Sequence, residues 1–225
     1  MTESRSGYIR EINGPILRIH LPGGRNGEQV RIGSLDIVGE IIALEGGDAI
    51  VQAYESTDGL RPGEAVHGLG HPLTVELGPG LLQGIFDGVQ RPLQEIASIA
   101  GDNIPRGLRI HSLDRERAWA FVPADGLEPG KHIAAGARLG TVQETETIEH
   151  RILVPPTISG ELIDLAPAGD YTLDSTIARV RDALGSVHKM TLYHRWPVRQ
   201  ARPYGRRDHG VEPLITGQQI GRAHV

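Results

Sequence analysis

The sequence predicts a mainly β protein, with an N-terminal six-stranded β-barrel followed by a second β-rich domain that contains short helices. Glycine (30) and proline (15) make up a fifth of the 225 residues, a density that favours short strands joined by many turns. Between these turn residues, short apolar runs recur with the period-2 alternation of strands. Aromatic residues form only 4% of the chain, so we expect cores built from Ile, Leu, Val and Ala.

Residues 1–72 are predicted to form the barrel. Five strand patterns are separated by turn signals, and a Pro-Gly turn at Pro62-Gly63 then leads into a sixth strand at Val66. Closing several short strands into a barrel removes the exposed edges of a sheet. The five patterns cover residues 8–12, 16–21, 30–32, 37–44 and 49–54.

Residues 73–95 are predicted to form a connector with a strand, a turn and a helix. Apolar and polar side chains alternate over 73–77, and the Gly-Pro-Gly sequence of 78–80 marks a turn. We expect a short helix next, in which Gly84 and Gly88 let another backbone pack closely. The apolar face of this helix would contain Leu81, Leu82, Ile85, Phe86 and Val89.

Residues 96–185 are predicted to form the second domain, and residues 186–219 to lead out of it. Pro92 breaks the preceding pattern, and a short helix over 94–100 should end at Gly101. Strands are expected at 106–113 and at 187–193. Between them, residues 119–123 carry most of the local aromatic bulk, and two similar stretches follow at 132–143 and 152–171.

The composition excludes several classes of protein. A net charge of −5 argues against a nucleic-acid partner. The absence of cysteine excludes disulfides and thiolate metal sites, and cytosolic residence is the simple interpretation. No apolar run reaches the roughly 20 residues of a membrane span, and the N-terminus has no signal-peptide core. We therefore expect no direct insertion into a membrane.

One block of the sequence has a specific resemblance. VELGPG at 75–80, followed by IFDGVQRPL at 85–93, resembles the segment after the N-terminal barrel in the catalytic A subunit of vacuolar- and archaeal-type rotary ATPases. Further blocks resemble the barrel of the same protein and its approach to the nucleotide-binding domain. They are IVGEIIAL (37–44), AIVQAYESTDGLRPG (49–63), WPVRQARP (196–203) and EPLITGQ (212–218), so that the resemblance extends over roughly 7–219.

The resemblance implies that the chain is an N-terminal fragment of the catalytic A (alpha) chain that lacks the nucleotide-binding domain. Residues 96–185 would be the bulge, a barrel-sandwich-like insertion specific to A subunits. The complete subunit would use ATP and Mg²⁺, and would couple ATP hydrolysis to proton or sodium transport or run as a synthase. Its partners would be the B subunits of the hexameric head and the central and peripheral stalks. The protein would be cytoplasmic, peripheral to the membrane through the complex.

The fragment itself is expected to supply crown assembly and stalk contacts rather than catalysis. No GxxxxGK[S/T] pattern occurs in the sequence, and the glycine-rich stretches 23–27, 78–80 and 84–88 lack the following Lys-Ser/Thr. They therefore lack the ammonium and the magnesium-binding hydroxyl that ATP hydrolysis requires. We assign no catalytic and no cofactor-binding residue, and we expect this chain alone to be inactive.

The histidines and arginines do not form a recognisable site. His67 with His71 and His188 with His194 are the close histidine pairs, but neither has a pattern typical of a metal site, so none is assigned. No Ser-His-Asp set stands on a G-x-S-x-G elbow. The basic run Arg195, Arg199, Arg202, Arg206 and Arg207 lacks the aromatic platform of RNA-binding proteins, and a solvated or subunit-facing strand edge is favoured.

Lys189 suggests an alternative function. The VPPTISGEL sequence of 154–162, a Gly-Asp turn and then His188-Lys189-Met190 resemble biotinyl or lipoyl carrier modules. Those modules need a lysine at an exposed hairpin tip, whereas Lys189 precedes an apolar strand pattern. A free-standing paralogue that regulates the ATPase head is a further alternative.

The last six residues, 220–225, depart from the family pattern. They match the peptide that a common sequencing adapter encodes in one reading frame. We predict an artefactual tail after residue 219, which a natural stop codon directly after Val225 would contradict.

Overall fold

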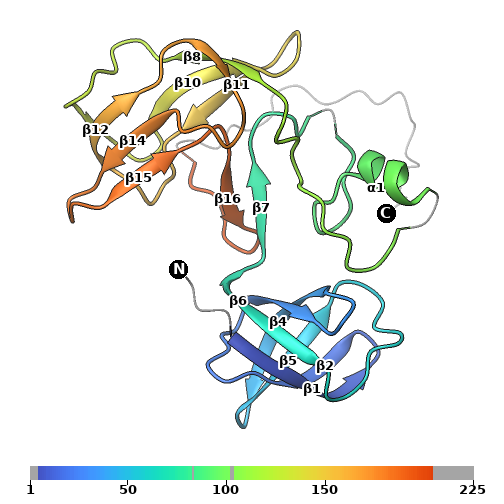
Figure 1. Ribbon diagram of the computed structural model, residues 1–225. Helices are drawn as coiled ribbons and strands as arrows, with labels where there is room; N and C mark the ends of the chain where they lie inside the picture. The colour runs from blue at the N-terminus through green and yellow to red at the C-terminus, as the bar shows by residue number, and fades with distance from the viewer. Residues whose placement is uncertain (1–4, 83, 102–103, 205–225) are drawn as a thin grey trace, which may run out of the picture.

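The N-terminal part of the chain is a closed six-stranded antiparallel barrel (Figure 1). The computed structural model describes residues 5–82, 84–101 and 104–204. Neighbouring strands around the barrel follow the order β1-β2-β5-β4-β3-β6, so the last strand closes on the first. The predicted barrel is confirmed. Its strands are β1 (Arg5–Asn13), β2 (Ile16–His20), β3 (Glu28–Ile32), β4 (Ile37–Glu45), β5 (Asp48–Ala53) and β6 (Ala65–Pro72).

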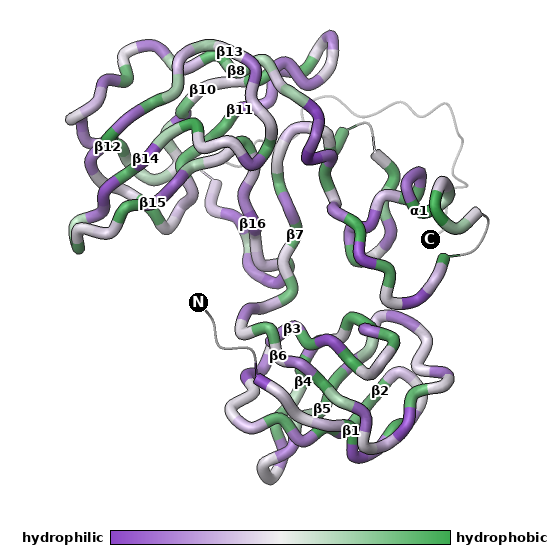
Figure 2. The backbone as a smooth tube through the Cα atoms, viewed as in Figure 1, coloured by the Kyte–Doolittle hydropathy of each residue, from purple (hydrophilic) through white to green (hydrophobic). Residues whose placement is uncertain are grey.

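Alternating side chains build the barrel core. In β3, Val30 and Ile32 are fully buried and the intervening Arg31 is not, as the pleat requires. Figure 2 shows the resulting mixture of hydrophobic and hydrophilic residues along the barrel strands. The β4–β5 hairpin turns at Gly46 and Gly47, which both have positive φ, the geometry of a two-residue turn that matches the strand twist.

The connector (residues 73–95) begins with the predicted strand. β7 (Thr74–Leu77) pairs antiparallel with β16 (His194–Pro197), with Val75 opposite Trp196. In Figure 1 this two-stranded ribbon runs between the barrel and the second domain. The ribbon joins distant parts of the sequence, because Arg195 faces Glu76.

The helix predicted over residues 81–89 is wrong. The described part of this segment contains turns and one isolated bridge between Phe86 and Pro92. The Asp87 carboxylate accepts hydrogen bonds from the backbone N–H groups of Val89 and Arg91, which replaces helical bonding with a side-chain turn. The expected close backbone approach at the glycines is also wrong, since a Cβ on Gly84 would meet the Phe86 ring and one on Gly88 would meet nothing.

The short helix predicted over 94–100 is confirmed as α1 (Leu93–Ala100). Pro92 precedes its first turn, where a missing N–H costs no helical bond. Gly101 ends the helix with a φ of 68°, and its N–H donates to the Ala97 carbonyl, so the expected end at Gly101 is confirmed. Ile96 is the buried residue of the helix.

The strand predicted over residues 106–113 is also wrong. Residues 104–118, which we call the strap, contain turns and bends and no strand. A strand needs a neighbour for its backbone groups, and the closed barrel beside the strap offers no free strand edge. The strap instead bonds to side chains and carbonyl groups of the barrel.

The second domain is a sandwich of two four-stranded sheets, as the prediction of a barrel-sandwich-like β domain required. One sheet has the order β11-β10-β8-β13 and the other has the order β15-β14-β12-β9. The strand at 178–181 was not predicted. The strands are β8 (Trp119–Pro123), β9 (His132–Ile133), β10 (Arg138–Gln143), β11 (Glu149–Leu153), β12 (Gly160–Leu165), β13 (Gly169–Tyr171), β14 (Ala178–Arg181) and β15 (Val187–Met190).

The sandwich has its own hydrophobic core, separate from that of the barrel. Phe121, Leu139, Leu162, Leu173 and Ile177 are its largest fully buried side chains. Gly140 is required here, because a Cβ would lie 2.4 Å from both the Phe121 ring and the Val122 carbonyl. At about 25 cal/mol per Å² of buried apolar surface, a core of this kind is the main stabilising contribution to the domain.

Lys189 does not occupy a hairpin tip. It lies within β15, directly opposite Arg179 of β14. The turn of this hairpin lies at residues 182–186, where Gly185 donates to the Asp182 carbonyl. A carrier lysine must project from the turn, so the structure gives no support to the biotinyl or lipoyl alternative.

No helix within the described ranges is long and apolar enough to cross a bilayer. EPLITGQ, Arg206, Arg207 and the predicted tail at 220–225 lie outside the described residues.

Candidate functional site

Four glutamates with little solvent exposure lie where the connector, the strap and the segment after β16 contact the β domains and each other. We call Glu40, Glu55, Glu76 and Glu144 the joint carboxylates. Their side chains are between 2% and 11% exposed. An ionised carboxylate is costly to bury unless cations and hydrogen-bond donors surround it. Each joint carboxylate receives such donors from a distant part of the chain.

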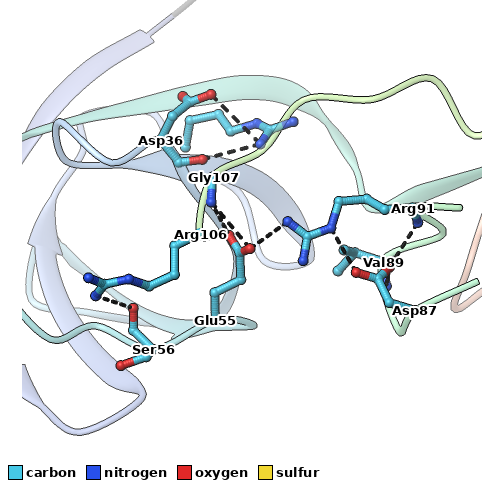
Figure 3. A network of polar contacts seen from close by, with 9 residues as sticks. Asp36, Glu55, Ser56, Asp87, Val89, Arg91, Arg106 and Gly107 are labelled. Atoms are coloured by element: carbon cyan, nitrogen blue, oxygen red, sulfur yellow. Dashed lines mark hydrogen bonds and ion pairs between the residues drawn. The ribbon is translucent and has the colours of Figure 1, made fainter. Parts of the chain in front are cut away.

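Glu55 follows β5 and binds the connector to the barrel (Figure 3). Arg91 donates from Nη1 to Glu55 Oε1 at 2.6 Å and from Nε to Asp87 Oδ2 at 2.7 Å. The Glu55 side chain is 7% exposed and that of Arg91 is 10% exposed. Burial alone would lower the pKa of Arg91, but the hydrogen bonds to Asp87 and Glu55 raise it. Arg91 therefore carries its charge at any physiological pH.

The strap contacts the same carboxylate at Gly107. Its backbone N–H lies 3.2 Å from Glu55 Oε1 and 3.0 Å from Oε2, as Figure 3 shows. Gly107 has a φ of 67°, and a Cβ there would lie 1.7 Å from the carbonyl oxygen of Leu35. Only glycine combines this backbone conformation with so close an approach to the barrel. Glu55 thus holds the connector and the strap together.

Two arginines fix the strap on either side of Gly107. Arg106 donates to the carbonyl groups of Ser56 and Asp58, just after β5. Arg109 pairs with Asp36, which also lies 3.8 Å from Arg31 of β3. The strap is therefore attached to the barrel at three successive points.

Glu40 of β4 binds the segment after β16. Arg199 donates from Nε to Glu40 Oε1 at 2.5 Å and from Nη2 to Oε2 at 3.0 Å. The Tyr54 hydroxyl donates to the same carboxylate. Burial would raise the pKa of Glu40, but the hydrogen bonds from Arg199 and Tyr54 lower it. This bidentate contact joins residues 159 positions apart. Its two parallel hydrogen bonds have the geometry that favours arginine over lysine.

Glu76 of β7 organises the ribbon. Its carboxylate pairs with Arg115 of the strap and, at 3.4 Å, with Arg195 of β16. Its backbone exchanges two hydrogen bonds of 2.7 Å with the Gln90 side chain. The Arg115 guanidinium also lies over the Tyr193 ring at 3.9 Å, a favourable cation–π contact.

Glu144, after β10, binds the sandwich to the connector. Its Oε1 accepts from the backbone N–H groups of Gly80 and Leu82 at 2.7 and 3.2 Å. Its Oε2 lies 3.0 Å from His150 Nδ1. The four carboxylates thus attach the connector, the strap and the segment after β16 to the barrel, the ribbon and the sandwich at four separate points.

Two family models match the chain, one for each β domain. The model described as the ATP synthase alpha/beta family β-barrel domain matches residues 9–70. The model described as the ATP synthase alpha/beta subunit barrel-sandwich domain matches residues 110–199. The chain belongs to the ATP synthase alpha/beta family. The predicted family resemblance is confirmed.

Similar proteins are named as the alpha chain or the A subunit of such synthases. The V-type ATP synthase alpha chain of Nitrosococcus oceani is 54% identical over 214 residues, which cover 95% of this chain and 36% of that protein. The A subunit of the A-type ATP synthase of Methanopyrus kandleri is 47% identical over 221 residues, covering 98% of this chain and 37% of that protein. That of Thermococcus kodakarensis is 45% identical over 214 residues, with 95% and 36% covered. The chain spans little more than a third of their lengths.

In this member of the ATP synthase alpha/beta family, the joint carboxylates are suited to holding domains together. Each one accepts hydrogen bonds from other groups of the protein. Among the described residues, no three His, Asp or Glu side chains are grouped so that they could hold a metal ion. The joint carboxylates therefore hold backbone segments at defined positions.

The members of each histidine pair contact different groups. His67 Nδ1 contacts Ser6 Oγ at 3.2 Å, whereas His71 contacts the Pro72 carbonyl. His188 pairs with Asp182 at 2.7 Å, whereas His194 lies 2.7 Å from Arg202 Nη1. In neither pair do the two histidines contact a common group.

The basic run is solvated where it is described, since the Arg195 and Arg199 side chains are 59% and 68% exposed, but both arginines also have acidic partners. Arg195 and Arg199 contact the buried carboxylates Glu76 and Glu40. Arg202 lies over the Trp196 ring at 4.8 Å. Of these three arginines, Arg199 joins the segment after β16 to the barrel, while Arg195 and Arg202 contact residues of the ribbon.

Sequence reasoning missed the joint carboxylates and their partners. A signal was present, because Glu76, Asp87 and Arg91 are charged residues inside the specific VELGPG and IFDGVQRPL blocks. Glu40 likewise interrupts the otherwise apolar IVGEIIAL block. Charges within apolar runs indicate either an exposed face or a buried ion pair, and local pattern cannot distinguish these.

Acidification is expected to destabilise the protein through His194. Burial, with the positive charges of Arg202 and His150, lowers the pKa of His194 to about 4. An unfolded histidine titrates near about 6.5, so the unfolded state binds the extra proton first. Stability is therefore lost as pH falls from about 6.5 towards about 4, on the order of 1 kcal/mol once solvent screening is considered.

Urea unfolding at about pH 7 and about pH 5 measures this loss. In His194→Gln, whose amide oxygen can still accept from Arg202, the difference in stability between the two pH values should shrink. An unchanged pH dependence in that variant would contradict the assignment to His194.

Removal of Arg199 is expected to raise the pKa of Glu40. Arg199→Ala removes the bidentate contact. The Glu40 carboxylate, which is 3% exposed, then keeps Tyr54 as its partner. NMR titration of the Glu40 carboxyl carbon measures the pKa. Arg202→Ala is the control, because Arg202 contacts His194 instead of Glu40. Equal Glu40 pKa values in the two variants would contradict the contact.

Proposed function

We propose that this chain is the N-terminal scaffold of the catalytic A subunit of a V/A-type rotary ATPase. The complete subunit hydrolyses ATP with Mg²⁺ and couples the reaction to proton or sodium transport, or runs in reverse as a synthase. The observation that supports this most is the order of the two matched domains, together with A-subunit relatives 45–54% identical over 95% of the chain. The activity is inferred from the names of the relatives, and the scaffold role is inferred from the contacts of the described residues.

The residues of this chain contribute assembly. Its barrel packs beside the barrels of B subunits in the hexameric head, and its sandwich contacts the peripheral and central stalks. The protein is cytoplasmic and reaches the membrane through the complex. The joint carboxylates support this role, because a protein that transmits force needs its domains held at fixed angles.

The domain boundaries belong to the same proposal. Residues 1–72 form the barrel, 73–95 the connector and 96–185 the bulge, and residues 186–219 lead towards a nucleotide-binding domain. In support, the matched ranges 9–70 and 110–199 leave the connector between them.

A chimera tests the scaffold role. Residues 5–204 would replace the aligned segment of the Methanopyrus kandleri protein, which is 47% identical. The chimera is expected to assemble with its partner subunits and to retain ATPase activity. The aligned Thermococcus kodakarensis segment, in a second chimera, is the control. Assembly of the control together with failure of a folded first chimera would contradict the proposal.

Nucleotide binding by the chain alone is a second test. The sequence lacks the GxxxxGK[S/T] loop, so calorimetry with Mg-ATP should show no heat of binding at micromolar concentrations. Saturable micromolar binding would contradict a purely structural role for these residues.

A further inference from the structure

A cavity of about 310 Å³ opens between the two sheets of the sandwich. Its walls include β11 and β15 and the turn of the connector at Leu77 and Leu81. β11 and β15 are the outer strands of their sheets, so no described strand lies beyond either of them. The volume is in the range of small-molecule sites.

The floor of the cavity is apolar. Ile152, Met190 and Leu192 are buried residues of the sandwich core that also line it, and Leu153 and Ile158 complete the surface. A ligand that enters must therefore present an apolar body, because this floor offers few hydrogen-bond partners.

The charged residues of the lining are all cations. Arg151, Lys189 and Arg202 are exposed, and none of the 16 lining residues is Asp or Glu. Within the described part of the chain, none of the three lies within 4 Å of a carboxylate oxygen. Two carboxylates near the lining have other partners: Glu144 contacts His150, Gly80 and Leu82, and Asp164, which shares a neighbouring pocket with Lys189, pairs with Arg179. The opening is thus positively charged, in a chain whose net charge is −5.

We propose that this cavity binds a small organic anion with an apolar body, such as a medium-chain or aromatic carboxylate. The hydrocarbon part occupies the floor formed by Ile152, Met190 and Leu192, and the anionic group meets Lys189, Arg151 and Arg202 at the opening. The site adjoins one joint carboxylate, because its lining residue His150 contacts Glu144, and it is independent of the assembly role proposed above. It gives Lys189 a binding role that needs no covalent attachment.

The lowered pKa of His194 is consistent with a positive electrostatic potential in the cavity. After burial, the nearby charges of Arg202 and His150 are what lower its pKa. A ligand carboxylate beside Arg202 would offset part of this field. Arg202 is well placed for such a contact, because its guanidinium is held between the Trp196 ring and His194 Nε2, which reduces the entropy lost on binding.

Two fluorescent probes with one ring system test the proposal on the full chain. 8-Anilinonaphthalene-1-sulfonate carries an anionic group, and N-phenyl-1-naphthylamine does not. We expect the anionic probe to bind once per chain and about tenfold more tightly than the neutral probe, and octanoate, but not octanol, to displace it. Equal affinities, or an absence of saturable binding, would overturn the proposal.

Single-charge variants locate the binding. Lys189→Gln and Arg151→Gln should each weaken the anionic probe about threefold to tenfold, as expected for one partly solvated charge contact. Arg25→Gln removes an exposed cation from the barrel and should leave the affinity unchanged. Equal affinities in all three variants would show that the probe binds elsewhere, which also overturns the proposal. NMR shifts confined to Ile152, Met190 and His194 would support it.

Discussion

Arg91→Ala is expected to destabilise the protein by about 3–5 kcal/mol, the usual cost of removing one partner from a buried ion pair. The substitution leaves the Glu55 and Asp87 carboxylates, which are 7% and 16% exposed, without their shared cation. Both charges would then remain in a site of low solvent access. Guanidinium or urea unfolding, followed by the fluorescence of Trp119 and Trp196, measures the effect.

Arg18→Ala is the matched control for Arg91→Ala. Arg18 contacts Glu45 at 3.0 Å, but the two side chains are 44% and 57% exposed. An exposed pair of this kind contributes about 0–1 kcal/mol. If the two variants lost the same stability, burial would not be what makes the Glu55–Arg91 contact important.

Gly107→Ala is expected to release the strap from the barrel and to cost about 3 kcal/mol or more. A Cβ would lie 1.7 Å from the Leu35 carbonyl oxygen, and a positive φ of 67° adds strain of about 1–2 kcal/mol. The backbone cannot keep both its position and its hydrogen bond to Glu55. Hydrogen exchange should become faster at residue 107 and in the connector, while the β2 and β5 amides stay protected.

Gly126→Ala is the control that separates the clash of the new Cβ from the strain of a positive φ. Gly126 has a similar positive φ of 78°, but nothing lies within 4 Å of a Cβ placed there. This variant should lose only the conformational part, about 1–2 kcal/mol. A Gly107→Ala variant no less stable than Gly126→Ala would show that the strap does not rest on the barrel.

The barrel could be predicted from the sequence because its signals are local. Period-2 alternation in residues 28–32 and the Gly46-Gly47 turn are each complete within a few residues. A local pattern was misleading in the connector, where the helical spacing of Leu81, Ile85 and Val89 predicted a helix that is absent. The Asp87 carboxylate takes the backbone N–H groups of that segment into a turn, a competition that apolar spacing cannot reveal.

The joint carboxylates could not be predicted because their partners are distant. Glu40 and Arg199 are 159 residues apart, and Glu55 and Gly107 are 52 apart. The family resemblance identified the blocks that contain Glu76, Asp87 and Arg91, but it assigned these residues no role. Their burial and their pairing become visible only when the fold is known.

The scaffold role requires the joint carboxylates to hold the barrel and the sandwich in one fixed orientation. The chain has no cysteine, so Glu11→Cys on the barrel and Leu184→Cys at the β14–β15 turn allow a pair of nitroxide labels. Leu184 is 92% exposed, and Glu11 is also exposed. Pulsed electron paramagnetic resonance then gives the distribution of label–label distances. We predict a single narrow distribution that broadens when Arg91→Ala is added, whereas a broad distribution before that substitution would contradict the claim.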